Sequence, residues 1–197
     1  GMDALTANTT GTSNTALGKG SLLSNTTASN NVAVGLSTLQ ANTTGAQNVA
    51  IGASALYTNT SGANGTALGH QALASNSTGA NNTAIGFESL YANTTGADNV
   101  AVGKGALDAN TTASDNIAIG SNALTTNTTG TANVAVGTSS LEDNTTASNN
   151  TAVGQAALAN NTTGADNTSI GSASLAANTT GTLNTASGSN ALRYNTT

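Results

Sequence analysis

Residues 99–103 read NVAVG, and the pattern returns at residues 116–120 as NIAIG and at residues 133–137 as NVAVG. The copies therefore recur with a 17-residue step, from Asn99 to Asn116 and from Asn116 to Asn133. Within the first copy the apolar residues Val100 and Val102 lie two apart, which is the periodicity of a β-strand. A strand that recurs at a fixed step predicts a stack of similar coils, each using the contacts of the one before it.

The same 17-residue step holds along the whole chain without an insertion or deletion. Leu recurs from residue 5 to residue 192, Gly from residue 18 to residue 188 and Asn from residue 8 to residue 195. A disordered low-complexity segment would tolerate slippage, so this register predicts a single repeat domain over residues 1–197, a parallel β-roll of about 11–12 coils. The expected strands lie near residues 14–18, 31–35, 48–52, 65–69, 82–86, 99–103, 116–120, 133–137, 150–154, 167–171 and 184–188.

The second and fourth residues of each pattern are expected to face inward, together with the Leu that follows. The Ala between them would then face outward beside Gly, where a small-residue surface admits another chain. The predicted structural core is Val34, Leu39, Ile51, Leu56, Ile85, Leu90, Val102, Leu107, Ile119, Leu124, Val136, Leu141, Val153, Leu158, Ile170 and Leu175. Because this core is thin, we expect oligomerisation to bury further apolar surface.

The segment after each Gly, such as residues 87–93 (FESLYAN), is rich in the helix formers Ala, Leu, Glu and Gln. It is predicted to form one or two helical turns, with a second strand as the alternative. The NTTG that follows predicts a turn, because Asn and Gly tolerate left-handed backbone and Asn and Thr bond to nearby backbone groups.

Composition excludes several classes of function. The chain has 197 residues, no Cys, a net charge of −5 and only three Lys or Arg residues. The absence of Cys excludes disulfides and thiolate metal sites, and the scarcity of cations argues against nucleic acid as a partner. No apolar run is long enough for a membrane-spanning helix, so no membrane insertion is expected.

Few residues are candidates for a chemical site. His70 is the only His and shares its repeat position with Phe87 and Lys104, which indicates a solvent-facing position. Without a second His or a Cys there is no catalytic triad or zinc cage, so no catalytic, cofactor or metal site is predicted and the chain is not expected to be an enzyme.

Three acids and two tyrosines leave alternatives open. Asp98, Asp115 and Asp166 share the position before the repeated Asn, where a weak Ca²⁺ site is the alternative to a solvated, turn-capping role. Tyr57 and Tyr91 share the position after Leu, two coils apart. They could stack on a sugar, although a partly exposed aromatic without a ligand is the plainer interpretation.

The paired Thr residues of the NTT turns form two columns at the coil spacing. They are candidate ice- or ligand-facing columns, which include Thr26, Thr27, Thr43, Thr44, Thr94, Thr95, Thr111, Thr112, Thr128 and Thr129. Flat ice-binding arrays use outward Thr residues two apart on a strand, whereas these are adjacent in a turn. Ice binding is therefore the alternative function and not the leading one.

Residues 98–103 (DNVAVG), 115–120 (DNIAIG) and 30–35 (NNVAVG) resemble the head repeat of trimeric autotransporter adhesins. The whole unit is similar to repeat arrays of bacterial surface proteins and phage tail fibres. The resemblance implies an intertwined or side-by-side homotrimer of parallel β-rolls at a bacterial cell surface or in a virion fibre, outside the cell. It implies a structural or adhesive segment, a stalk or head that presents or mediates attachment to a receptor or glycan that the sequence does not name.

Overall fold

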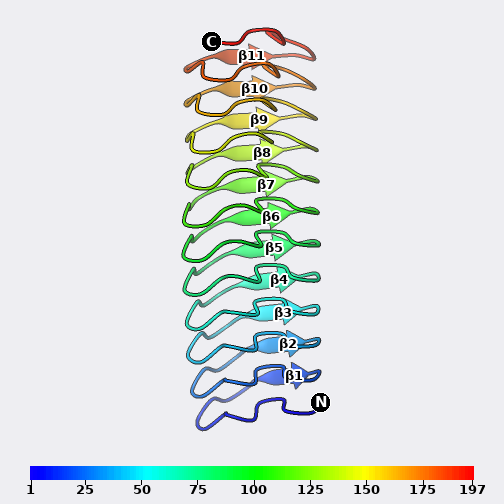
Figure 1. Cartoon of the computed structure of the whole chain (residues 1–197), viewed down its shortest axis with the longest axis vertical. Coiled ribbons are helices and arrows are strands. Elements are labelled where there is room, and N and C mark those ends of the chain that lie inside the picture. The colour runs from blue at the N-terminus through cyan, green and yellow to red at the C-terminus, as the bar shows by residue number, and fades with distance from the viewer.

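The NVAVG pattern forms the only regular secondary structure in the chain, which the computed structural model describes over residues 1–197 (Figure 1). Each coil contributes one strand of three residues. The strands are β1 (Thr15–Leu17), β2 (Val32–Val34), β3 (Val49–Ile51), β4 (Thr66–Leu68), β5 (Thr83–Ile85), β6 (Val100–Val102), β7 (Ile117–Ile119), β8 (Val134–Val136), β9 (Thr151–Val153), β10 (Thr168–Ile170) and β11 (Thr185–Ser187).

The strands pair in parallel and in chain order, which makes one sheet along the side of a rod. The register equals the sequence repeat, so Val100 pairs with Ile117 and Ala101 with Ala118. Each strand occupies the middle three residues of its predicted five-residue range. The sequence prediction of a parallel β-solenoid with 17-residue coils is therefore confirmed.

The direction in which the strand residues face is the reverse of the prediction. The central Ala is buried, with Ala101 and Ala118 both 0% exposed, and the residues on either side face outward. The predicted core residues Val34, Ile51, Ile85, Val102, Ile119, Val136, Val153 and Ile170 are half-buried or exposed, and their assignment to the core is wrong. The predicted Leu residues are all buried and form the core with the Ala column. Because each Leu fills the narrow coil from the opposite wall, the strand side has room for only a methyl group.

The segment after each Gly, such as residues 87–93, contains neither the predicted helical turns nor the alternative second strand. We call it the return segment. The φ angle alternates in sign along this segment. Glu88 and Leu90 both have positive φ angles, and so does every Leu of the repeat. Backbone hydrogen bonds here run to the next coil, as from the Leu39 N–H to the Ala55 carbonyl at 3.0 Å. These bonds between coils take the place of the bonds within a helix, and local helix propensity is overridden. The chain accordingly has no helix that could cross a membrane.

A ladder of buried Asn amides ties the turns of neighbouring coils together. The Asn93 amide donates to Asn76 Oδ1 at 2.9 Å and to the Gly96 carbonyl at 3.0 Å, so it both stacks on the previous coil and closes its own turn. The same pair of bonds recurs in successive coils from Asn25 to Asn178. Buried polar groups need such partners, and the ladder supplies them at every interior rung.

A second Asn ladder precedes the strands and is interrupted once. The Asn99 N–H donates to Asn82 Oδ1 at 3.0 Å, and the Asn99 amide donates to the Ala113 carbonyl at 2.9 Å. Gly65 stands where this column otherwise has Asn, so it accepts no bond from the next coil, although its own N–H still donates to Asn48 Oδ1 at 2.8 Å. The interruption leaves one link of the column unmade.

Two buried side-chain atoms have no partner, and both lie at the C-terminal end of the ladders. They are Asn178 Oδ1 in the first ladder and Asn184 Nδ2 in the second. Asn195, the next residue of the first column, donates instead to the Thr197 carbonyl at 2.7 Å.

Glycine is required at the end of each strand, where φ is positive and the backbone of the next coil lies close. Gly103 has a φ of +135°, and a Cβ on it would lie 2.5 Å from the Gly120 carbonyl oxygen. No larger residue fits that space or that conformation. This column therefore permits the close spacing that the paired strands require.

Candidate functional surfaces

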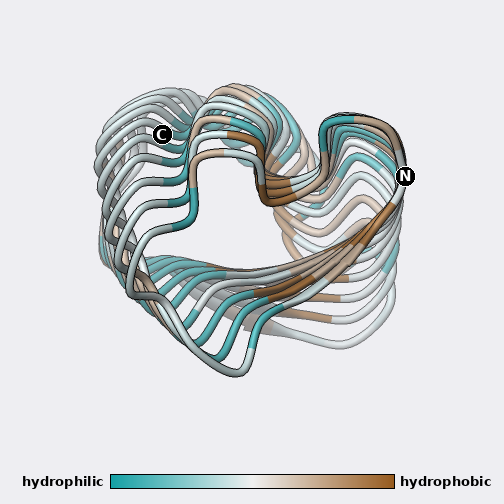
Figure 2. Ribbon diagram, turned by 90° about the horizontal axis from the view of Figure 1, so that it is seen from below, coloured by the Kyte–Doolittle hydropathy of each residue, from teal (hydrophilic) through white to brown (hydrophobic).

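The strand side of the rod is an apolar surface that nothing in the chain covers. The two outward residues of each strand form two columns of Val, Ile, Leu and Thr, with Ser187 at the C-terminal end, and neither column contains a charged residue. Leu17 is 63% exposed, Ile170 46% and Ile119 41%. We call this surface, the first and third residues of β1 to β11, the strand face; Figure 2 shows the apolar colouring that runs along it from coil to coil.

The size of the strand face can be estimated from strand geometry. Eleven parallel strands at about 4.8 Å span roughly 50 Å, and two side-chain columns make a strip roughly 10 Å wide. The strip of about 500 Å² is in the range of the largest apolar patch of an ordinary monomer, which often has a function.

The two predicted Thr columns differ from one another. The first Thr of each pair is bonded to the next coil, since the Thr94 hydroxyl donates to the Thr111 carbonyl at 3.0 Å and the Thr43 hydroxyl to the Thr60 carbonyl at 2.9 Å. This column includes Thr26, Thr43, Thr94, Thr111 and Thr128. The second column is exposed and includes Thr27, Thr44, Thr95, Thr112 and Thr129. Only this second column is free to meet a ligand.

The three acids of the Asp column are exposed, and two of them accept a bond from the Asn one coil before. The Asn81 amide donates to Asp98 Oδ1 at 3.0 Å, and the Asn149 amide donates to Asp166 Oδ1 at 3.1 Å. Asp115, one coil beyond Asp98, has no such bond. The structure brings together no group of three or more His, Cys, Asp or Glu residues that could hold a metal ion.

His70 is exposed, as its repeat position predicts, but it is not isolated. Its ring stacks on Phe87 of the next coil, with centroids 5.5 Å apart and planes 10° from parallel. Tyr57 is 40% exposed and Tyr91 half-buried. The signal in the sequence for the His70–Phe87 contact is the 17-residue spacing between two ring-bearing residues, which sequence reasoning noted only as a shared position.

One carboxyl group, that of Asp108, has a shifted pKa. Partial burial, and then the charge of the nearby Glu88, raise the pKa of Asp108 above its ordinary value. Asp108 follows Leu107 and shares the column of Tyr91, so Glu88 and Asp108 act on one another across the return segment of two adjacent coils. Sequence reasoning missed Asp108, because residues 20 apart become neighbours only through the coil geometry.

The rod offers surfaces and no cavity, since the structure has no pocket. Comparison with protein-family models, with curated proteins and with solved structures finds no match. What the chain shows is a parallel β-solenoid of 17-residue coils, with an uncovered apolar sheet on one side and small polar turns on the others.

Proposed function

We propose that this protein is a non-catalytic structural or adhesive rod, a segment of a fibre at a bacterial cell surface or in a virion. The strand face carries this proposal: an uncharged apolar strip runs the length of a rod stiffened by two Asn ladders. A rod of this kind contributes length, rigidity and a repeated surface, none of which requires a pocket. The resemblance of residues 98–103 to adhesin head repeats supports an extracellular setting.

The partner proposed for the strand face is a second copy of the chain, in a homotrimer. Three strips of about 500 Å² that meet around a common axis bury up to about 1,500 Å² together, which is above the roughly 1,000 Å² expected of a specific interface. Charged partners are disfavoured because the strand face offers no charge to pair with theirs. The Ala side of the strand, which the sequence suggested as the interface, lies in the core and is not available.

Light scattering tests self-association directly. The chain has a mass of 18.8 kDa, and a trimer has three times that mass. Ile119→Lys on the strand face is expected to reduce the mass to that of a monomer, because it places a charge in the apolar contact. Thr129→Lys, on the exposed Thr column, is the matched control and is expected to leave the mass unchanged. A monomeric wild-type chain would contradict the proposed interface.

A second candidate function is ice binding, which we propose would use the strand face and not the Thr turns. Flat arrays need outward residues two apart on a strand, and the outward first position is Thr in β1, β4, β5, β9, β10 and β11. An ice-recrystallisation assay separates the candidates. Inhibition that is lost in Thr83→Lys and kept in Thr129→Lys favours ice binding, and no inhibition by the wild-type chain excludes it.

A further inference from the structure

Large side chains gather on one part of the return segment, over the coils of β4 to β6. Three columns meet there: the first and second residues after the strand Gly, and the residue after Leu. Their aromatic, amide and carboxylate occupants form the aromatic–carboxylate patch, which consists of His70, Gln71, Phe87, Glu88, Tyr91 and Asp108, and Lys104 continues the first column one coil beyond Phe87. On the C-terminal side of Tyr91 none of the three columns holds another aromatic residue. The patch is therefore a local departure from a repeat built mostly of small residues.

Coil geometry brings the three columns of the patch into contact. The His70 and Phe87 rings stack in the first column. The residue after Leu approaches the second column 20 residues earlier, since Gln40 Oε1 lies 3.8 Å from the place of a Cβ on Gly20. The influence of Glu88 on Asp108 shows the same register. The same 20-residue offset relates Tyr91 to Gln71, so we expect these two side chains to be neighbours.

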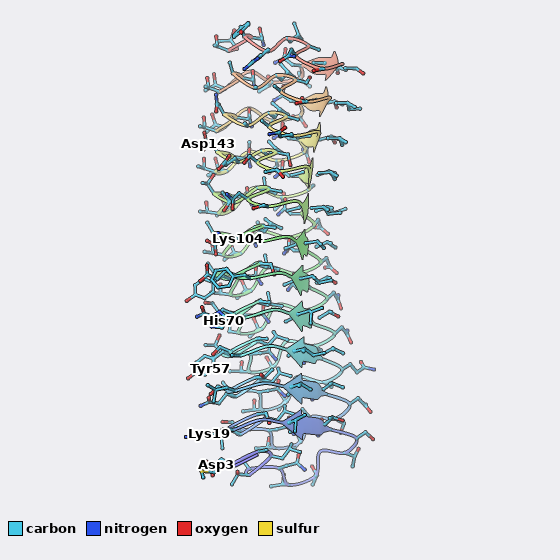
Figure 3. All side chains as sticks on the ribbon, turned by 90° about the vertical axis from the view of Figure 1, so that its right-hand side faces the viewer. Asp3, Lys19, Tyr57, His70, Lys104 and Asp143 are labelled. Carbon is cyan, nitrogen blue, oxygen red and sulfur yellow. The ribbon has the colours of Figure 1, made fainter.

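The patch therefore has an ordered arrangement. The second column, with Gln71 and Glu88, lies between the column of the stacked ring pair and the column that holds Tyr91 and Asp108. Phe87 is 44% exposed and His70 is exposed, so ring surface is open to solvent beside the polar groups. Labelled members of these columns, Tyr57, His70 and Lys104, lie on the side of the rod away from the strands (Figure 3). The patch stays open when strand faces meet.

The mixture of rings and carboxylates selects among ligand classes. An apolar protein surface would bury the carboxylates of Glu88 and Asp108 without donors, which costs free energy. An anionic polymer would be repelled by those carboxylates and by the net charge of −5. A neutral sugar avoids both costs, because its apolar ring face stacks on an aromatic ring while its hydroxyls donate to carboxylate and amide oxygens.

We propose that the aromatic–carboxylate patch binds a neutral glycan, with sugar rings against Phe87 and Tyr91 and hydroxyls bonded to Gln71, Glu88 and Asp108. The proposal rests on the adhesive role proposed above and deepens it by naming the class of receptor. It uses a different surface from the strand face, so the two can fail separately.

The aromatic NMR spectrum of the full chain is a direct test, because the chain has one His, one Phe and three Tyr residues. Maltoheptaose, cellohexaose and chitohexaose serve as three neutral probes. At least one is expected to shift the signals of His70, Phe87 and Tyr91 while Tyr194, at the C-terminal end, stays unchanged. No shift with any of the three probes, or equal shifts at all rings, would overturn the proposal.

Variants that copy residues of other coils test the location without disturbing the fold. Phe87→Ala copies Ala53 and Tyr91→Ala copies Ala74, each from the same column. Each is expected to weaken binding of the responding probe about three- to tenfold, the worth of one aromatic contact. Tyr57→Ala, in the column of Tyr91 but outside the patch, is the control and should bind as the wild type does. A loss with Tyr57→Ala as large as with Tyr91→Ala would overturn the location.

The mass measurement keeps this proposal distinct from the proposed function. A chain that forms trimers but shifts with no probe remains a fibre rod and loses the glycan patch. A monomer that binds a probe through Phe87 retains the patch and loses the strand-face interface.

Discussion

The size of a residue decides which way the strands face. Outward Val and inward Ala reverse the usual distribution of apolar residues. A strand of period two predicts alternation but does not say which set faces inward. The missed signal lay within the repeat itself: the central position is Ala in every strand except for Ser169, whereas the first position accepts Val, Ile and Thr. A position that admits only the smallest side chains is one that the coil confines.

Substitutions in β6 distinguish the two orientations. Ala101→Val adds volume at a fully buried site and is expected to lower the free energy of unfolding by about 1–3 kcal/mol. Val100→Thr, which copies Thr83 of the neighbouring strand, should change it by less than about 0.5 kcal/mol. Urea denaturation measures both. A larger loss for Val100→Thr than for Ala101→Val would restore the inward assignment of Val.

Asp108 makes a pH-dependent contribution to stability. Its pKa is higher in the folded chain than in the unfolded chain, so protonation favours folding. This contribution is fully present below the unfolded pKa, about 3.9, and is lost as the pH rises through the folded pKa.

Asp108→Asn should therefore stabilise the chain at pH 7, and the gain should vanish near pH 3. The gain is expected to be below about 1 kcal/mol, since the partly exposed carboxyl is screened by solvent. Thermal unfolding at the two pH values measures it, with Asp143→Asn at an exposed turn as the control. Destabilisation by Asp108→Asn at pH 7 would contradict the cause given for the shift.

Within each coil, contacts with the neighbouring coils determine the conformation more than local preference does. The strand and the NTT turn could be predicted because their residue types favour those structures in isolation. The return segment could not, because alternating backbone with Leu at positive φ costs about 1–2 kcal/mol per residue and is held by bonds to the next coil. Sequence alone does not show those bonds.

A coupling between two positions of the turn has the same origin. Ala replaces the turn Gly at Ala28, Ala113 and Ala147, and Ser follows each time. The Ser114 hydroxyl accepts the Ala97 N–H of the previous coil at 3.0 Å, and Ser29 and Ser148 accept equivalent bonds. The pair Ala–Ser thus adds a bond between coils that the pair Gly–Ala or Gly–Thr lacks.

The interrupted Asn ladder gives a test at this scale. Gly65→Asn should raise the free energy of unfolding by about 1–2 kcal/mol, because the new amide can accept the Asn82 N–H and donate to the Gly79 carbonyl. Replacing Gly also reduces the entropy of the unfolded chain. A Cβ at residue 65 would lie 2.9 Å from Asn48 Oδ1, so the end of that side chain must shift slightly to admit the new residue. Asn99→Gly is the matched control and should destabilise by a similar amount, and equal stabilities of the three chains would contradict the role of the ladder.

Over the whole molecule, one repeat unit generates a rod, a sheet and every surface column at once. The strand face is long because eleven strands keep one register, and the aromatic–carboxylate patch is compact because it departs from the repeat over a few coils. The overall architecture could therefore be predicted from periodicity. The contacts within the aromatic–carboxylate patch could not be predicted in this way, because they depend on how far the return segment of one coil extends over the neighbouring coil.

Register predicts how the rod responds to deletion. Removing residues 99–115 takes out one whole repeat unit and joins Asp98 to Asn116, the same junction that Asp115 makes in the intact chain. All columns stay aligned, so this variant should fold into a rod shorter by about 4.8 Å, which small-angle scattering measures. Its stability should fall only in proportion to the one coil lost, because each coil interacts only with its neighbours.

Removing residues 99–116 instead takes out one residue more and provides the control. The coil at the junction then lacks an Asn rung of the second ladder and is shorter by one residue, about 3.3 Å of extended chain. It cannot close over the same distance, so urea denaturation should show a much larger loss of stability or two separate transitions for the segments on either side. Equal stabilities of the two deletion variants would mean that the coils do not depend on a common register. That result would contradict the solenoid as the folded state of the chain.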